Sequence, residues 1–172
     1  MRIALLILPL LVLAACQPKK EDLLAKKWKA SEVENPKQDS FLIEQEQFID
    51  TFGRNNDAAT NIKEYGFSNV DSARASLKAA FADYKKMQQH AVENTWFNFG
   101  KNGVVVMNFS GQQDSAKWYF DKEGKLIIDE PKLKGSGNTI KMEVMNLDDT
   151  TLKLKFIDNN GTSTVTFHPD KK

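Results

Sequence analysis

The sequence predicts a mainly β domain, an antiparallel eight-stranded barrel with two helices inserted between its first and second strands. From Asn94 to the C-terminus, short segments alternate apolar and charged residues between turns rich in glycine, asparagine and aspartate. Upstream, residues 40–93 show the longer period of amphipathic helices. Alternation gives each strand one solvent-exposed face, which is typical of antiparallel sheets. About eight such strands can close into a barrel; a two-sheet sandwich is the alternative.

The first fifteen residues have the layout of a secretory signal peptide. Arg2 supplies the positive charge, and the apolar run Ile3–Leu13 follows it. This run is too short to span a bilayer, which requires about 20 apolar residues. Small residues then lead directly into Cys16, the only cysteine of the chain. We therefore expect residues 1–15 to be removed and Cys16 to begin the mature protein.

Composition narrows the possible functions of the mature chain. Of the 24 basic residues only Arg2 lies in the signal segment, so 23 basic and 23 acidic residues remain. A net charge near zero argues against a nucleic-acid partner. Because no cysteine follows Cys16, an intramolecular disulfide and a cysteine nucleophile are both excluded. The fold must depend on an apolar core.

The mature chain divides into a short tether and one domain. Residues 16–22 form a lipidated polar tether that reaches at most about 20 Å. Residues 23–172 form the barrel domain, and its first predicted strand is Leu23–Val33, with Trp28 between lysines. The helical insertion covers about residues 38–93.

Two helices are predicted within this insertion. The first is capped by Ser40 and ends near Phe52, before Gly53. The second starts at a capping-box-like pair, Ser68 and Asp71. Its apolar positions share one face, so we expect it to cover an apolar surface. These positions are Val70, Ala73, Leu77, Ala80, Phe81, Tyr84, Met87 and Ala91.

Seven further strands are predicted after the helices. A Gly100–Gly103 turn with Asn-Gly inside it separates the first two, which is typical of a β-hairpin. The predicted strands are residues 95–99, 104–109, 115–120, 125–129, 139–146, 151–157 and 162–168.

Several segments resemble the lipocalin-like lipoproteins of Bacteroidetes. Leu13-Ala14-Ala15-Cys16 resembles a lipobox, and it is followed by L-L-A-K-K-W-K-A-S-E-V-E, by W-Y-F-D-K-E-G-K-L and by the closing segments L-K-L-K-F and T-V-T-F-H-P. Lys26 stands where the family's Gly-x-Trp pattern has glycine. The resemblance covers the first strand and about the last eighty residues, and not the segment from about Asn35 to Glu93.

The resemblance implies a fold, an anchor and a location. It implies a lipocalin-like barrel and a diacylglyceryl thioether on Cys16, with cleavage before it and acylation of the new amino terminus. The lipid would hold the protein on the outer membrane of the cell envelope. The tether Q-P-K-K-E-D resembles the surface-export signal of such lipoproteins, although a plain solvated linker is equally compatible with it. Periplasmic and surface-facing locations both stay open.

No pattern in the sequence indicates catalysis, a metal or another cofactor. His90 and His168 are far apart and show no ligand spacing, and no nucleophile or phosphate-binding motif occurs. We expect His90 at a helix end and His168 exposed. Asp148-Asp149 and Asp158-Asn159-Asn160-Gly161 have the composition of hairpin turns rather than of complete calcium loops.

An aromatic and aliphatic set provides the candidate ligand cavity. The candidate positions are Trp28, Phe97, Phe99, Trp118, Phe120, Met142, Val144 and Phe156, with Phe167 as a further aromatic. The same side chains could instead fill a packed core. The sequence thus leaves two hypotheses: a non-catalytic module that binds a small apolar ligand, and a ligand-free structural or interaction lipoprotein with an envelope protein as partner.

Overall fold

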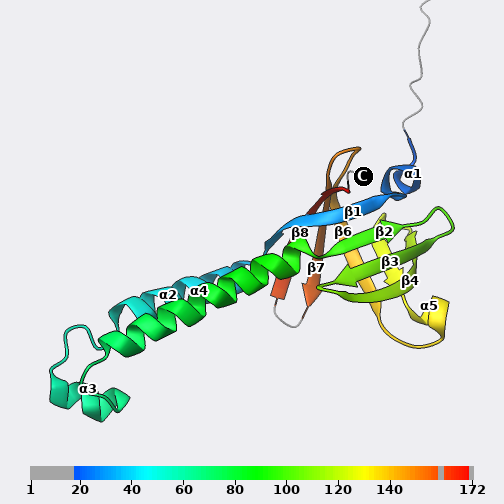
Figure 1. The fold of residues 1–172 in the computed structure, drawn as a ribbon. Helices are drawn as coiled ribbons and strands as arrows, with labels where there is room; N and C mark the ends of the chain where they lie inside the picture. Colours follow the sequence, from blue (N-terminus) through cyan, green and yellow to red (C-terminus); the bar gives the residue numbers. More distant parts are fainter. Residues whose placement is uncertain (1–17, 159–160, 171–172) are drawn as a thin grey trace, which may run out of the picture.

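The computed structural model describes residues 18–158 and 161–170, so Cys16 and the signal segment lie outside the described residues. Eight antiparallel strands close a barrel in sequential order, with β1 pairing both β2 and β8 (Figure 1). The predicted barrel is confirmed, and the sandwich alternative is wrong. The strands are β1 (Lys27–Glu34), β2 (Trp96–Phe99), β3 (Val104–Phe109), β4 (Gln112–Phe120), β5 (Leu126–Asp129), β6 (Thr139–Leu147), β7 (Leu152–Asp158) and β8 (Gly161–Pro169).

The barrel has two different ends. We call the end at which β1 begins the closed end, because the short helix α1 (Lys20–Leu24) lies there and contacts β6. We call the opposite end the mouth; β1 ends and β2 begins there. The predicted first strand started too early: Leu23 and Leu24 belong to α1, whose Leu24 side chain is buried. The tether is correspondingly shorter, since Lys20–Asp22 are helical.

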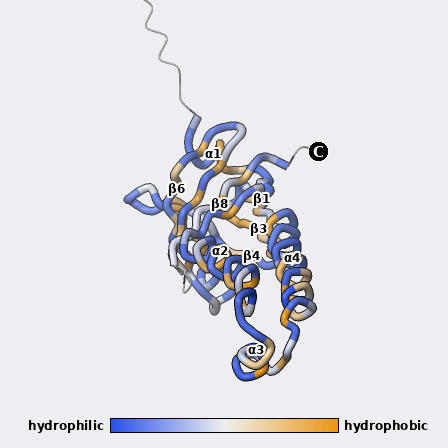
Figure 2. The backbone as a smooth tube through the Cα atoms, turned by 90° about the vertical axis from the view of Figure 1, so that its left-hand side faces the viewer, coloured by the Kyte–Doolittle hydropathy of each residue, from blue (hydrophilic) through white to orange (hydrophobic). Residues whose placement is uncertain are grey.

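Three helices connect β1 to β2: α2 (Pro36–Thr51), α3 (Ala58–Tyr65) and α4 (Asp71–Glu93). Helices α2 and α4 run side by side away from the mouth, and α3 forms their far tip (Figures 1 and 2). We call this projection the arm. The two predicted helices are confirmed as α2 and α4, whereas α3 was not predicted. No helix within the described ranges is long and apolar enough to cross a membrane.

Both predicted helix starts were wrong. Asn35 caps α2, and its Oδ1 accepts a hydrogen bond from the Gln38 N–H at 3.1 Å. Pro36 then fits the first helical position, where no N–H is needed. Ser40 therefore lies inside the helix. At α4, Asn69 Oδ1 accepts the Asp71 N–H at 2.8 Å, and Val70 at the cap position makes no side-chain cap.

The closed half of the barrel is filled by large apolar side chains. Trp28, Phe99, Leu126 and Ile128 are almost fully buried there, and the Trp118 ring meets Phe99 edge to face at 5.5 Å between centroids. The buried indoles have partners: Trp28 Nε1 donates to the Leu24 carbonyl at 2.9 Å. Trp118 Nε1 donates to the Gly100 carbonyl at 3.0 Å. This half is a packed core.

Candidate ligand-binding site

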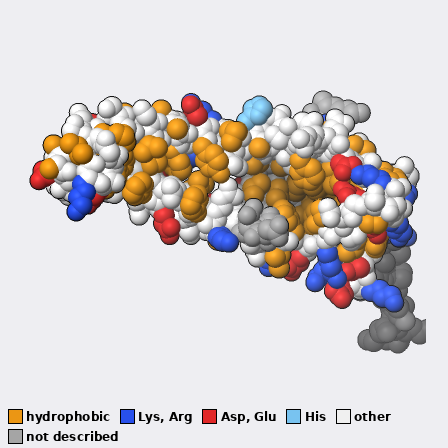
Figure 3. Space-filling view, turned by 90° about the horizontal axis from the view of Figure 1, so that it is seen from below, with side chains coloured by type: hydrophobic (Ala, Val, Ile, Leu, Met, Phe, Trp, Pro, Cys, Tyr) orange, Lys and Arg blue, Asp and Glu red, His pale blue; other side chains and the backbone are white. Residues whose placement is uncertain are grey.

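A half-open cavity of about 1090 Å³ occupies the mouth of the barrel. Figure 3 shows the barrel hollowed on the side from which the arm projects, with apolar side chains in the hollow. The cavity is bounded by strand ends and by the parts of α2 and α4 nearest the barrel. Its apolar lining comprises Val33, Leu42, Ala91, Val92, Phe97, Phe109, Ile140, Met142, Leu154, Phe156, Ile157, Val165 and Phe167.

The lining divides into an apolar wall and a polar rim. Phe97 meets Phe109 and Phe167 with ring centroids 5.4 Å and 5.1 Å away, so three aromatic rings form one continuous part of the wall. Met142 and Leu154 are buried in the same wall. Polar residues are contributed mainly by the start of α2, the end of α4 and the strand ends: Ser31, Glu32, Asn35, Gln38, Asp39, Lys85, Gln88, Gln89, Thr95, Ser110, Thr139 and Ser163. Such a site suits an apolar ligand with a polar end.

Asn35 joins the start of α2 to the barrel. Its side chain is buried, caps the helix and donates from Nδ2 to Ser163 Oγ on β8 at 3.0 Å. Both polar groups are therefore satisfied within the wall, as buried polar groups must be. This contact fixes where α2 leaves the barrel.

The end of α4 is joined to the barrel by a second set of polar contacts. Thr95 Oγ1 donates to the Ala91 carbonyl at 2.9 Å, and Asn108 Nδ2 on β3 donates to the Asn94 carbonyl at 2.5 Å. The two ends of the arm are thus held on either side of the β1–β2 pair. The arm borders the cavity and does not cover it.

Ion pairs extend from the rim along one side of the arm. Lys85 Nζ lies 3.0 Å from Glu46 Oε1, and Lys78 Nζ lies 2.5 Å from Asp50 Oδ1. The hydrogen bond from Lys78 is the main cause that lowers the pKa of the Asp50 carboxyl. These pairs are solvent-exposed and each is worth little in stability. The ion pairs show that this side of the arm is polar.

The structure separates the residues predicted to line the cavity into two groups. Phe97, Met142, Phe156 and the further aromatic Phe167 lie in its wall. The others do not line it: Trp28, Phe99 and Trp118 are buried in the packed core, and Phe120 and Val144 pack against that core. The reason is the position of each residue along the barrel axis, between the closed end and the mouth. Phe120 ends β4 at the closed end, whereas Phe156 approaches the mouth near the end of β7.

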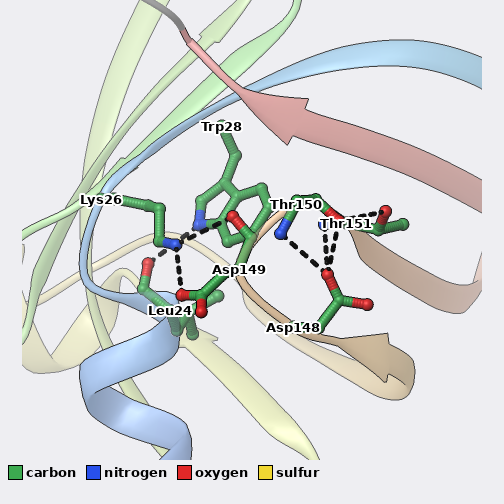
Figure 4. Close-up of polar contacts among 7 residues, drawn as sticks. All are labelled: Leu24, Lys26, Trp28, Asp148, Asp149, Thr150 and Thr151. Atoms are coloured by element: carbon green, nitrogen blue, oxygen red, sulfur yellow. Dashed lines mark hydrogen bonds and ion pairs between the residues drawn. The ribbon is translucent and has the colours of Figure 1, made fainter.

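Polar contacts at the closed end join the β6–β7 turn to Lys26, in the segment between α1 and β1 (Figure 4). Lys26 Nζ donates to the Asp149 carbonyl at 3.2 Å and lies 5.0 Å from the Trp28 ring centroid. Asp148 Oδ1 accepts the Thr150 and Thr151 N–H groups and the Thr150 hydroxyl within 2.9 Å. Hydrogen bonding, chiefly from the Thr150 N–H, lowers the pKa of Asp148 to about 2. Asp148 is therefore a turn residue.

The remaining candidate residues have structural positions of their own. His90 lies in the last turn of α4 beside Asn94, and His168 is exposed on β8, where its Nδ1 lies 2.9 Å from the Thr150 carbonyl. The turn predicted at Asp158–Gly161 includes residues 159–160, which lie outside the described residues. Residues 18–158 and 161–170 contain no cluster of three or more side chains able to hold a metal ion.

Several wall and rim residues were missed from the sequence. Leu154 and Val165 alternate with polar neighbours and face inward. Their inward orientation was evident from the sequence, but their position along the barrel axis was not. Asn35 could have been recognised from Asn-Pro, an N-cap residue followed by proline at the first helical position. Ser163 carries no signal of its own, because its role arises only through contact with Asn35.

The chain was compared with protein-family models, curated proteins and solved structures, and none of them matches it. The cavity and its lining are therefore the basis on which a function is inferred.

Proposed function

We propose that the mature protein is a non-catalytic, lipocalin-like lipoprotein that binds one small apolar ligand in the mouth of its barrel. The observation that carries the proposal is the half-open cavity of about 1090 Å³, whose wall is aromatic and aliphatic. Ligand sites typically measure about 300–1,000 Å³ and combine an apolar lining with a few polar groups. The volume of the cavity slightly exceeds this range, which favours a large ligand.

Energetics favour a long apolar chain over a short one. Each methylene transferred from water contributes about 0.8 kcal/mol, so about fifteen contribute about 12 kcal/mol. Association costs at least about 4 kcal/mol in lost freedom. About 8 kcal/mol then remains, which corresponds to a Kd of about 1 μM. A chain of about six methylenes would bind only at millimolar concentrations or weaker by the same reasoning.

The position of α1 indicates how the anchored barrel would be oriented relative to the membrane. Cys16 precedes Lys20, the first residue of α1, by four residues, which span at most about 14 Å. A lipid on Cys16 would therefore attach near the closed end, because α1 lies there. The mouth and the arm lie at the other end of the barrel (Figure 1). The anchored protein would present its cavity away from the outer membrane that holds it.

A binding titration with two matched variants tests the ligand site. The chain from residue 17 onward, which carries every described element, is titrated with a fluorescent long-chain fatty acid. Ile140→Trp places a bulky ring in the cavity wall and should weaken binding at least about tenfold, or 1.4 kcal/mol. Met145→Trp, on the exposed face of the same strand, should bind as the parent does. Equal binding by both variants, or no binding by the parent, contradicts the proposal.

The anchor is tested separately by fractionation of the full-length chain. Cys16→Ser removes the only thiol that could carry the lipid. The variant should leave the membrane fraction or persist as an uncleaved precursor, as judged by mass. Unchanged membrane fractionation and processing would exclude lipidation of Cys16.

One observation favours the second candidate function, that of an interaction lipoprotein. No residue of α4 is buried, although the helix carries a regular apolar face. Ala91 of this face lines the cavity, whereas Leu77, Tyr84 and Met87 are exposed, so the described residues supply no surface that covers most of the face. A face of this kind suits contact with another molecule.

A further inference from the structure

Helix α4 carries two apolar seams rather than one. The first holds two partly buried residues, Phe81, which lies beside Ile49 of α2, and Val92, which packs against the barrel core. A second seam follows the spacing four, three, four, three, four along the helix: Ala73, Leu77, Ala80, Tyr84, Met87 and Ala91. This alternation of three and four is the pattern by which one helix packs along another.

Helix α2 continues the second seam on the same side of the arm. Phe41 and Phe48 are seven residues apart and share a face with Phe52 just beyond the helix. The Arg74 guanidinium of α4 lies 5.4 Å from the Phe52 ring and donates to the Phe52 carbonyl at 2.6 Å, which holds the end of α2 beside the first turn of α4. The ion pairs Lys85–Glu46 and Lys78–Asp50 lie on the other side.

The arm therefore has an apolar face, which we define by Phe41, Phe48, Leu77, Tyr84 and Met87. Their side chains are 55%, 53%, 43%, 36% and 60% exposed, respectively. Figure 3 shows apolar side chains gathered along the arm up to the hollow in the barrel. A two-helix hairpin with such a face lacks the other half of a helical bundle.

We infer that a second copy of this chain covers the apolar face, arm against arm, so that the two hairpins form a four-helix bundle. A two-fold axis brings the same face of both copies together, so the surface serves as its own partner. Large side chains bury about 150–250 Å² each when fully covered. Five of them, about half exposed, supply about 500 Å² per copy, which reaches the total of about 1,000 Å² expected of a specific interface.

Charge favours a second copy over a lipid surface. Residues 36–93 contain seven basic and nine acidic residues. Helices that lie on membranes instead carry a polar face rich in lysine and arginine. The mature chain is near neutrality, with 23 residues of each sign, so two copies do not repel each other through net charge. Because an interface of about 1,000 Å² is at the small end of specific interfaces, we expect a dissociation constant in the micromolar range.

Sedimentation equilibrium of the chain from residue 17 onward tests this inference without reference to any ligand. The parent should reach twice the monomer mass at micromolar concentrations. Tyr84→Glu places a charge at the centre of the apolar face and should weaken dimerisation at least about tenfold. Ile43→Glu is the matched control, because Ile43 is 57% exposed and lies on the opposite side of α2 from Phe41 and Phe48.

Circular dichroism establishes that each variant is folded, and Leu77→Lys replaces Tyr84→Glu if the latter is not. Loss of the dimer in the variant on the apolar face alone supports the inference. A parent that stays monomeric up to about 100 μM, two orders of magnitude above a micromolar constant, overturns it. Flotation of that monomer with neutral phosphatidylcholine vesicles would assign the face to a lipid surface, and equal dimerisation of all variants would place the interface elsewhere.

Discussion

Trp28→Phe should destabilise the barrel by about 1.5–2.5 kcal/mol, because the indole is a fully buried part of the closed end. The substitution removes the hydrogen bond from Nε1 to the Leu24 carbonyl, 2.9 Å away, although that carbonyl still accepts the Lys26 N–H at 2.7 Å. The loss of one such hydrogen bond costs about 0.5–1.5 kcal/mol. The smaller ring gives up roughly 40 Å² of apolar contact, or about 1 kcal/mol.

Urea denaturation followed by far-ultraviolet circular dichroism measures this loss, since domains of this size are stable by about 5–15 kcal/mol. Trp96→Phe is the control: Trp96 is half-buried on the outer face of β2, with Lys27 Nζ 4.7 Å from its ring centroid. The control should lose less than about 1 kcal/mol. Equal losses for the two variants, or a loss below about 0.5 kcal/mol at Trp28, would refute the assignment of a packed closed end.

Three further substitutions test local features of the fold. Ser110→Asn should stabilise the protein by a few tenths to about 1 kcal/mol in urea melts, because Ser110 has a φ of 52° in the β3–β4 turn and asparagine tolerates that conformation better. Asn35→Ala should cost about 2 kcal/mol by the same assay, because it removes a helix cap and leaves Ser163 without its partner. Asp148→Asn should flatten the acid limb of stability: the folded pKa of about 2 lies below the usual 3.8, so the carboxylate contributes stability above pH 3.8 that is lost as the pH falls toward 2. An unchanged free energy of unfolding in the Ser110 or Asn35 variant would contradict the first two expectations. An unchanged pH dependence of stability in the Asp148 variant would contradict the third.

The strands of the barrel could be predicted because inward and outward residues alternate along most of their length. In β7, Leu152 and Leu154 point inward and are buried, and Lys153 between them points out. The start of the first strand could not be predicted in the same way. Leu23-Leu24 is a short apolar pair without periodicity, so it fits a helix and a strand equally well. Only its packing at the closed end distinguishes the two.

The cavity was less predictable than the barrel. Alternation shows whether a side chain points into the barrel, but it does not show how far along the barrel axis the residue lies. Trp118 and Phe156 both occupy inward positions, but strand register places the first beside the packed core and the second near the mouth. Register depends on pairing between strands that are distant in sequence. The apolar face of α4 was visible in the sequence, whereas its exposure in the folded chain was not. An amphipathic pattern shows that a helix has a partner without showing which one.

Native mass spectrometry of the protein purified from bacterial envelopes tests the proposed ligand site most directly. The mature chain should carry one apolar passenger per barrel, and organic extraction should release a long-chain molecule that rebinds the emptied protein. Ile140→Trp should lose most of that passenger, and Met145→Trp should retain it. A parent protein that is purified empty and takes up no long-chain fatty acid would contradict the assignment of the mouth as a ligand site.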